Sequence, residues 1–175
     1  MNKRLIARAN RIRLAIFDVD GVLTDGTIYL SQRGEEMKAF NVGDGLGMKM
    51  LADGGIVAAL LSGRKSRVVE LRAKEIGITH VYQGISDKLD TYQRLLRKLR
   101  LAEEETSFMG DDLPDLPVLR RCGLAFSVPN APKVVRNSVH HVTSLAGGRG
   151  AVREVCEFLL EARGTLEDQL RAFRK

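Results

Sequence analysis

Short apolar runs alternate with longer amphipathic stretches along most of this chain. The apolar, β-branched runs predict strands at residues 13–17, 56–61, 80–82, 106–109, 124–128 and 139–142. The amphipathic stretches predict helices at residues 45–52, 66–76, 87–99, 114–121, 132–136 and 151–162. Alternation of this kind favours an α/β fold, in which a Rossmann-like parallel sheet is sandwiched by helices.

A small β-hairpin is predicted after the first strand. Residues 27–30 and 36–40 flank a polar turn with the sequence SQRG. With 44% hydrophobic residues and no linker-like segment, the chain can build one core. We therefore expect a single domain over residues 1–175, with a basic N-terminal arm at 1–13 and a C-terminal helical tail at 165–175.

The formal net charge of +6 is concentrated in the N-terminal arm, because residues 1–13 hold five basic side chains and no acidic one. The rest of the chain is nearly neutral, and aromatic residues make up only 5%, so we expect no nucleic-acid partner. No apolar run approaches the roughly 20 residues of a membrane span, so no membrane association is expected. Cys122 and Cys156 lack metal-ligand or redox spacing, which is typical of a cytoplasmic protein.

Reactive side chains cluster where the predicted strands end. In an open parallel sheet, ligands bind at the carboxyl ends of the strands, so residues that follow different strands meet at one edge. We therefore expect one site in which carboxylates, a hydroxyl and an amine lie together. The residues concerned are Asp18, Asp20, Ser62, Lys88, Asp111, Asp112 and Asp115.

Clustered carboxylates of this kind indicate a metal-assisted reaction. Oxygen ligands in a partly hydrated site suit Mg²⁺, and a metal-bound carboxylate beside a second carboxylate can act as nucleophile and acid/base. A phosphate ester is the substrate that such a site would stabilise. Taken singly, each motif has a more ordinary interpretation, as a turn, a helix cap or a solvated lysine. Their joint placement at separate strand ends favours the catalytic interpretation.

The sequence DVDGVLTD at residues 18–25, with Ser62, Lys88 and GDDLPD at 110–115, resembles the four motifs of the haloacid dehalogenase superfamily of phosphatases. The resemblance implies that Asp18 is the nucleophile and forms an aspartyl phosphate. It implies that Asp20 is the acid/base, while Ser62 and Lys88 hold the phosphoryl oxygens.

The same resemblance implies how Mg²⁺ is bound. The expected ligands are the Asp18 carboxylate, the Asp20 backbone carbonyl and Asp111. Asp112 and Asp115 are expected to orient water and the ligands themselves.

The spacing of the motifs leaves no room for a cap domain over the site. Ser62 follows Asp18 by 44 residues, and Lys88 follows Ser62 by 26. Independent domains start near roughly 50 residues. Water must then be excluded by something else, most simply a neighbouring subunit.

A closer resemblance covers nearly the whole chain. The segments NVGDGLG at 41–47, SGRK at 62–65, YQG at 82–84 and GGRGAVRE at 147–154 are similar to the capless phosphatases that act on 3-deoxy-D-manno-octulosonate 8-phosphate (KDO 8-phosphate) in lipopolysaccharide biosynthesis. The resemblance implies a homo-oligomer, a tetramer, in which hairpins and tails of adjacent subunits complete each site. It also implies contacts to a sugar-acid phosphate by Asp20, Asn41, Val42, Gly43, Asp44, Gly45, Lys49, Arg64, Arg72 and Lys88.

Other functions remain open at this point. Lys49 and Gly43 depart from the family pattern, which more often has Arg and a larger residue there. Related phosphatases act on nine-carbon, sialic-type 9-phosphates, for which we expect an acidic residue in place of Arg64. Outside the enzymes, a phosphoacceptor signalling domain also gathers Asp, Ser and Lys around Mg²⁺, but it lacks the acid/base two residues after the nucleophile.

Overall fold

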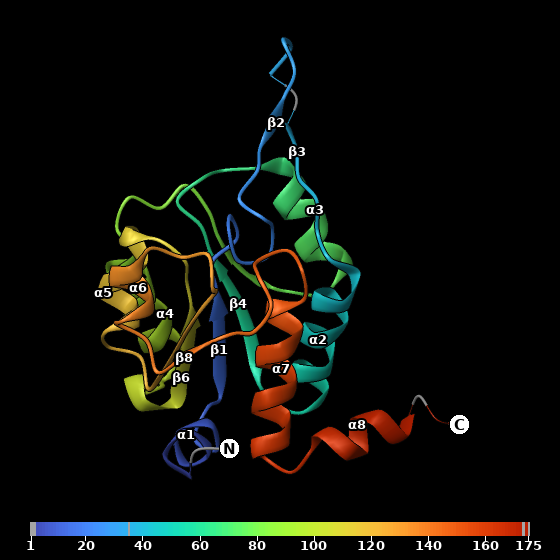
Figure 1. The fold of residues 1–175 in the computed structure, drawn as a ribbon, viewed down its shortest axis with the longest axis vertical. Coiled ribbons are helices and arrows are strands. Elements are labelled where there is room, and N and C mark those ends of the chain that lie inside the picture. The colour runs from blue at the N-terminus through green and yellow to red at the C-terminus, as the bar shows by residue number, and fades with distance from the viewer. Residues whose placement is uncertain (1–2, 35, 173, 175) are drawn as a thin grey trace.

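The computed structural model describes residues 3–34, 36–172 and 174, and over this part of the chain six parallel strands form one sheet (Figure 1). The strand order is β5-β4-β1-β6-β7-β8. All four residues of β1 are buried, as expected for a central strand covered on both faces. The strands are β1 (Leu14–Phe17), β4 (Val57–Leu61), β5 (His80–Tyr82), β6 (Thr106–Met109), β7 (Leu124–Ser127) and β8 (His141–Val142).

Helices cover both faces of the sheet, which confirms the predicted fold class. On one side lie α2 (Val42–Asp53), α3 (Arg67–Glu75) and α7 (Ala151–Ala162) (Figure 1). On the other lie α4 (Lys88–Leu99), α5 (Leu116–Leu119) and α6 (Lys133–Arg136). Two short 3₁₀ turns, Glu103–Glu105 and Leu113–Asp115, precede β6 and α5.

The first turn of α2 was not predicted, because three glycines in its sequence weaken the helical pattern. Asn41 supplies the missing signal as an N-cap: its side-chain oxygen accepts hydrogen bonds from the Gly43 N–H at 2.7 Å and the Asp44 N–H at 3.3 Å. The helix therefore begins at Val42 and not at residue 45.

The position of β1 creates the opening for a site. Ile16 pairs with Ala59 of β4 on one side and with Phe108 of β6 on the other. The chain runs outward from β1 through β4 to β5 and then returns to β6. A parallel sheet binds ligands at the carboxyl ends of the strands beside such a reversal.

The predicted hairpin is present and projects beyond the sheet (Figure 1). It consists of β2 (Tyr29–Leu30) and β3 (Glu36–Met37), with Tyr29 paired to Met37. In the described residues, only this hairpin and α2 lie between β1 and β4, and only α3 and β5 lie between β4 and α4. Neither connection contains a cap domain.

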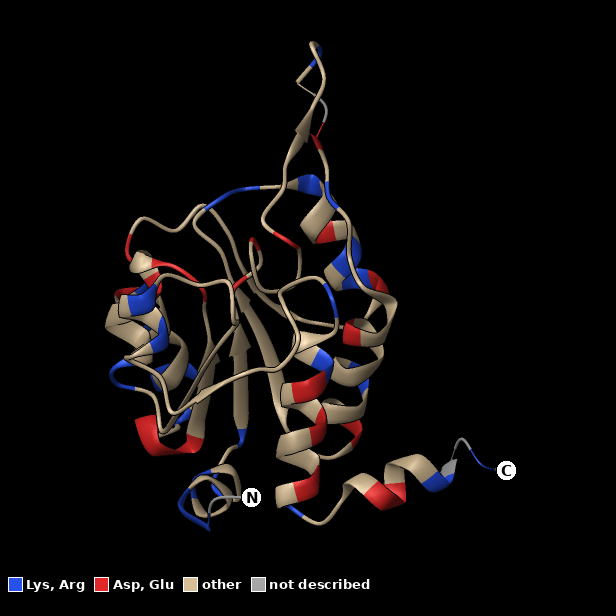
Figure 2. Cartoon of the chain, viewed as in Figure 1, with Lys and Arg blue, Asp and Glu red and all other residues tan. Residues whose placement is uncertain are grey.

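The N-terminal segment is a helix, α1 (Lys3–Ala9), for which the sequence analysis had predicted only a basic arm. Ala9 and Ile12 are fully buried, and the Arg8 guanidinium donates a hydrogen bond to the Gly123 carbonyl at 2.6 Å. This basic segment lies at the opposite end of the sheet from the carboxylates that follow β1 (Figure 2).

Beyond α7 the chain continues as a short helix, α8 (Leu166–Ala172), inside the segment for which a helical tail is predicted. Residues 173 and 175 of that predicted tail lie outside the described residues, as do residues 1 and 2 of the predicted arm. Among the described helices, none is both long enough and apolar enough to cross a bilayer.

Candidate active site

Asp18 is held at the carboxyl end of β1 by the neighbouring strand. Its backbone N–H donates to the Met109 carbonyl of β6 at 2.9 Å, and the residue is only 7% exposed. The chain then turns sharply at Gly21, whose φ of 86° is unfavourable for residues with a side chain. The Leu23 N–H closes the turn by donating to the Val19 carbonyl at 2.9 Å. The carboxylate is therefore presented from a rigid strand end.

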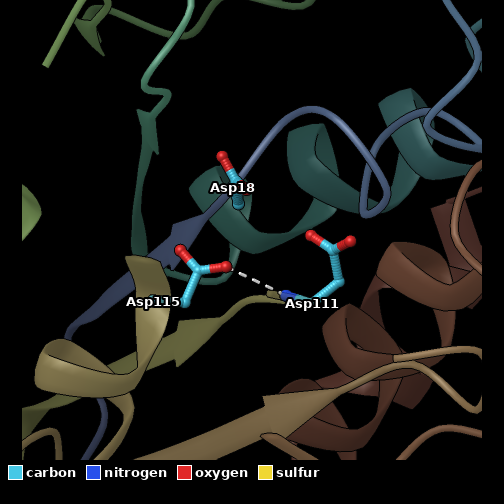
Figure 3. Close-up of side chains that lie close together, drawn as sticks. All are labelled: Asp18, Asp111 and Asp115. Carbon is cyan, nitrogen blue, oxygen red and sulfur yellow. Dashed lines mark hydrogen bonds between the residues drawn. The ribbon is translucent and has the colours of Figure 1, made fainter. Parts of the chain in front are cut away.

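Asp18, Asp111 and Asp115 gather at one place (Figure 3). Each offers a carboxylate oxygen, and these three oxygens lie within 4.8 Å of one another. Asp115 is fully buried and accepts hydrogen bonds from the Asp111 N–H at 3.0 Å and the Asp112 N–H at 3.1 Å. Asp115 thus shapes the loop that carries Asp111, while its role in orienting metal-bound water stays a prediction.

Lys88 joins two of these carboxylates. It is the first residue of α4, which Asp87 caps by accepting the Asp90 N–H at 3.0 Å. The Lys88 Nζ lies 2.6 Å from Asp115 Oδ1 and 2.9 Å from Asp18 Oδ1. The helix start therefore places a buried ammonium group against the predicted nucleophile.

The charges of this cluster favour an added cation. Burial and the charge of Asp115 raise the pKa of Asp18 to about 7. Burial, with Asp115 and Asp112, raises the pKa of Asp111 to about 7 as well. Burial by itself would lower the pKa of Lys88, but Asp18 and Asp115 outweigh it and raise that pKa.

One oxygen of the cluster also lacks a hydrogen bond. Among the described residues, the buried Asp111 Oδ1 has no hydrogen-bond partner. A buried carboxylate oxygen without a donor is a natural metal ligand, and a set of carboxylate oxygens suits Mg²⁺. The residues present therefore fit the predicted ion.

A cavity of about 330 Å³ opens over this cluster. Ser62 enters it from the end of β4, where its N–H donates to the Tyr82 carbonyl at 2.9 Å. A larger cavity, of about 620 Å³, lies between β5 and α4 and holds none of the predicted catalytic side chains. The smaller cavity is lined by all seven predicted strand-end residues, Asp18, Asp20, Ser62, Lys88, Asp111, Asp112 and Asp115, together with Gly26, Gly63, Arg64 and Pro114.

Most of the substrate contacts implied by family resemblance lie elsewhere in this single chain. The Asp44 carboxylate is buried and accepts the Arg153 N–H at 2.8 Å, which caps α7. Arg72 donates to the Asn41 carbonyl at 3.3 Å and pairs with Glu75 at 2.8 Å. Residues of this set outside the lining of the smaller cavity are Asn41, Val42, Gly43, Asp44, Gly45, Lys49 and Arg72. Their contact with substrate stays a prediction.

Sequence reasoning missed Lys38 and Glu36. Lys38 Nζ forms an ion pair with Asp20 Oδ1, and Glu36 Oε1 lies 3.2 Å from the same ammonium. Glu36 begins β3 and Lys38 follows directly after that strand, so in an extended chain their side chains point to the same face. Charged residues at alternate positions of a hairpin that begins directly after DVDGVLTD are the sequence signal that could have revealed Glu36 and Lys38.

Comparison with known proteins places these observations in a family. Residues 56–154 match the model of the haloacid dehalogenase-like hydrolases. The chain is 49% identical over 164 residues to the 3-deoxy-D-manno-octulosonate 8-phosphate phosphatase KdsC of Escherichia coli (strain K12), covering 94% of this chain and 87% of that protein.

Solved structures agree with this similarity. The phosphatase of the same name from Yersinia pestis superposes with a TM-score of 0.94 at 47% identity, covering 95% of this chain and 90% of that one. The Moraxella catarrhalis enzyme, solved in complex with a magnesium ion, a phosphate ion and a KDO molecule, gives a TM-score of 0.96 at 42% identity. That match covers 99% of each chain.

Proposed function

Since this chain belongs to the haloacid dehalogenase-like hydrolases, we propose that it is a Mg²⁺-dependent phosphatase that hydrolyses KDO 8-phosphate to KDO and inorganic phosphate. The observation that carries the proposal is the convergence of Asp18, Asp111, Asp115 and Lys88 in one cavity. Relatives that share nearly half of the sequence are phosphatases for this sugar-acid phosphate.

Asp18 is the proposed nucleophile. One of its carboxylate oxygens attacks phosphorus, and the bond between phosphorus and the sugar oxygen breaks. Asp20 gives its proton to the departing alkoxide. In the second half of the reaction Asp20 takes a proton from water, which attacks the phosphorus of the aspartyl phosphate and releases inorganic phosphate. Ser62 and Lys88 bind the phosphoryl oxygens in both halves.

Three groups would hold the metal: the Asp18 carboxylate, Asp111 and the Asp20 backbone carbonyl. When bound, Mg²⁺ supplies positive charge that neutralises the carboxylates and the phosphoryl group. Asp115 and Lys88 fix the carboxylates around it, and Asp112 caps the following turn by accepting the Leu113 N–H at 2.8 Å. Hydrogen bonds and ion pairs among these residues thus hold the proposed metal ligands in place.

Arg64 is proposed to recognise the carboxylate of the sugar acid. Arg64 lines the cavity, and about half of its side chain is exposed. Its planar guanidinium is therefore free to donate two hydrogen bonds to the carboxylate of the substrate. This arrangement favours the eight-carbon substrate over the sialic-type 9-phosphates. The latter remain the alternative substrate class.

We also propose that the chain acts as one domain in a homo-oligomer, a tetramer. The projecting hairpin exposes Tyr29 (55%), Leu30 (67%) and Met37 (66%), and large apolar side chains grouped in this way are typical of an interface. The basic helix α1 lies far from the cavity, so no nucleic-acid partner is proposed. The cytoplasm is the proposed compartment, because Cys122 and Cys156 are both buried as free thiols.

A substrate screen tests this function. Phosphate release is measured at saturating Mg²⁺ for KDO 8-phosphate, for nine-carbon sugar-acid 9-phosphates and for simple sugar phosphates. We expect kcat/KM to be highest for KDO 8-phosphate. A higher kcat/KM for a nine-carbon ester would make that ester the substrate in place of KDO 8-phosphate. A long-lived acyl phosphate without turnover would indicate a phosphoacceptor domain.

A further inference from the structure

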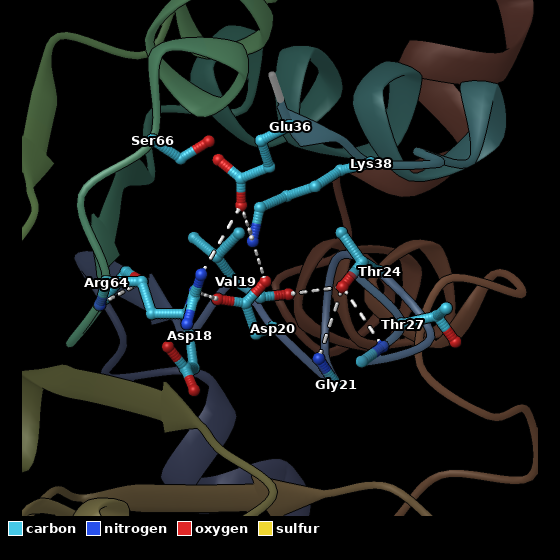
Figure 4. Close-up of polar contacts among 12 residues, drawn as sticks. Asp18, Val19, Asp20, Gly21, Thr24, Thr27, Glu36, Lys38, Arg64 and Ser66 are labelled. Atoms are coloured by element: carbon cyan, nitrogen blue, oxygen red, sulfur yellow. Dashed lines mark hydrogen bonds and ion pairs between the residues drawn. The ribbon is translucent and has the colours of Figure 1, made fainter. Parts of the chain in front are cut away.

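Lys38 reaches from the hairpin into the active site (Figure 4). Its side chain is 0% exposed, although it stands just beyond the end of β3 in a hairpin that projects from the body. Its Nζ pairs with Asp20 Oδ1 and lies 3.2 Å from Glu36 Oε1. A buried ammonium group is costly unless carboxylates compensate it, and here two do so.

Asp20 is held from two directions. Lys38 contacts its Oδ1, and Arg64 Nε lies 4.0 Å from its Oδ2. Glu36 ties the two cations together, because its Oε1 lies 3.2 Å from Lys38 Nζ and 4.0 Å from a terminal nitrogen of Arg64. Asp20, Lys38, Glu36 and Arg64 thus form a ring of side chains in which negative and positive charges alternate (Figure 4).

Of the two cations, Lys38 is the one able to fix the orientation of Asp20. The Arg64 side chain is 51% exposed and sits at the edge of ion-pair distance, so solvent and substrate can displace it. Lys38 is fully enclosed and anchored by a second carboxylate, so it has little freedom to move. Asp20 itself stands in the turn after β1 with its side chain 21% exposed, where a carboxylate can rotate.

We propose that Lys38 is a positioning residue for the acid/base of the reaction: it holds Asp20 through Oδ1, so that Oδ2, the oxygen that carries the transferred proton, is oriented toward the leaving-group oxygen. The proposal rests on the phosphatase function proposed above. It also makes the hairpin part of the catalytic apparatus within its own subunit, because a displaced hairpin would release Asp20.

The test compares two leaving groups. An alkyl phosphate such as KDO 8-phosphate needs a proton on its departing oxygen, whereas p-nitrophenyl phosphate departs as a stable phenolate. The ratio kcat/KM reports the reaction up to leaving-group departure, so it isolates the step in which Asp20 is the acid. For Lys38→Met we expect kcat/KM to fall about 100-fold with the alkyl ester, the scale of general acid catalysis, and less than about threefold with the aryl ester.

Three companion variants keep the result specific. Lys38→Arg keeps the charge and should recover part of the lost activity. Lys65→Met removes an exposed lysine from the loop after β4 and should leave both substrates unaffected. In an Asp20→Asn background, Lys38→Met should cause no further loss, because a residue that acts through Asp20 has nothing left to position.

Other results would overturn the proposal. Equal losses with both esters, accompanied by a lower Tm, would make Lys38 a structural residue of the hairpin. Unchanged or increased hydrolysis of the alkyl ester by Lys38→Met would contradict it directly. A wild-type protein that hydrolyses other alkyl phosphates but not KDO 8-phosphate changes the proposed substrate only, and the comparison is then made on the hydrolysed ester. A wild-type protein that hydrolyses neither class contradicts the proposed function and this proposal with it.

Discussion

Asp18 and Asp115 have the same side chain and both pair with the Lys88 ammonium group, yet their surroundings suit them to different roles. Asp115 uses both oxygens: Oδ1 accepts from Lys88, and Oδ2 accepts the N–H groups of Asp111 and Asp112. Asp18 is paired to the same ammonium through Oδ1 alone, at the longer distance of 2.9 Å. Asp115 is therefore suited to holding the site, and Asp18 to reacting in it.

The first prediction concerns the nucleophile. Asp18→Asn keeps the shape of the side chain but removes the carboxylate of the proposed nucleophile. Turnover should therefore fall by about 10⁴-fold or more, the scale found when a covalent nucleophile is lost. Phosphate release and the circular dichroism spectrum are measured together. Activity retained in a folded Asp18→Asn protein would remove Asp18 from this role.

The second prediction concerns pH and Mg²⁺. Without metal, Asp111 has a pKa near 7 against an ordinary 3.8, so its charged form is disfavoured in the folded state. Its contribution to stability is fully present below about pH 4 and is lost as the pH rises through about 7. Mg²⁺ binds the charged form and reverses this loss. The increase in Tm caused by saturating Mg²⁺ should therefore grow between about pH 5 and about pH 8.

The difference in Tm is the correct quantity to measure here. Burial lowers the pKa of His80 and of His140, so acidification destabilises the protein through these residues with or without metal. Subtracting the Tm measured without Mg²⁺ from the Tm measured with Mg²⁺ at the same pH removes the effect of these histidines. Asp111→Asn should make the Mg²⁺-dependent increase smaller and less dependent on pH, with the remaining dependence coming from Asp18, whose pKa is also raised to about 7. An unchanged increase in this variant would contradict the assignment.

At the scale of elements, the loop before α7 packs against the turn that follows β1 and Asp18. The Gly148 N–H donates to the Val22 carbonyl at 2.9 Å, so the two backbones lie against each other. A Cβ at Gly147 would stand 1.8 Å from the Gly21 carbonyl oxygen, which no side chain can tolerate. The GGRG segment at residues 147–150 therefore positions the turn that follows Asp18.

The third prediction follows from this contact. Gly147→Ala should push the turn after β1 away, lowering kcat by at least about tenfold and stability by about 1–3 kcal/mol, the usual cost of overpacking. Thermal unfolding and steady-state kinetics measure the two effects. Normal kcat in Gly147→Ala would show that the turn does not depend on this packing.

At the scale of the whole molecule, the hairpin of β2 and β3 projects from the body of the protein (Figure 1). The cavity over Asp18 has no domain of the described chain above it, while the hairpin presents Leu30 and Met37 to solvent. In the proposed tetramer these side chains are buried, and we expect a neighbouring subunit to cover the cavity. The proposed tetramer thus links the two features.

The fourth prediction tests that link. Leu30→Glu should dissociate the assembly, because it places a charge in an apolar contact, and should lower kcat/KM at least about tenfold through loss of water exclusion. Sedimentation velocity and activity are measured at the same concentrations. Val134→Glu, at an exposed apolar residue of α6, is the matched control and should change neither. A fully active Leu30→Glu monomer would contradict the role of assembly.

The strand-end residues of the site could be predicted from the chain alone, because local periodicity fixes the strands and parallel strands end at one edge of a sheet. Asp18, Ser62, Lys88 and Asp111 all follow from that rule, and the cavity confirms their convergence. The helix α1 was not predicted, since the five basic residues of segment 1–13 suggested a solvated arm. The buried Ala9 shows that packing against the body stabilises this helix.

Tertiary structure alone decided the parts played by Lys38 and Asp44. Asp44 contacts a backbone N–H that lies 109 residues away, and Lys38 meets Asp20 only because the hairpin folds back on the catalytic turn. Local sequence patterns carry the period of an element but not the packing between distant elements. Packing depends on how all the buried surfaces fit together. It makes Asp44 a cap of α7, while its contact with substrate stays a prediction, and it brings Lys38 against the proposed acid/base.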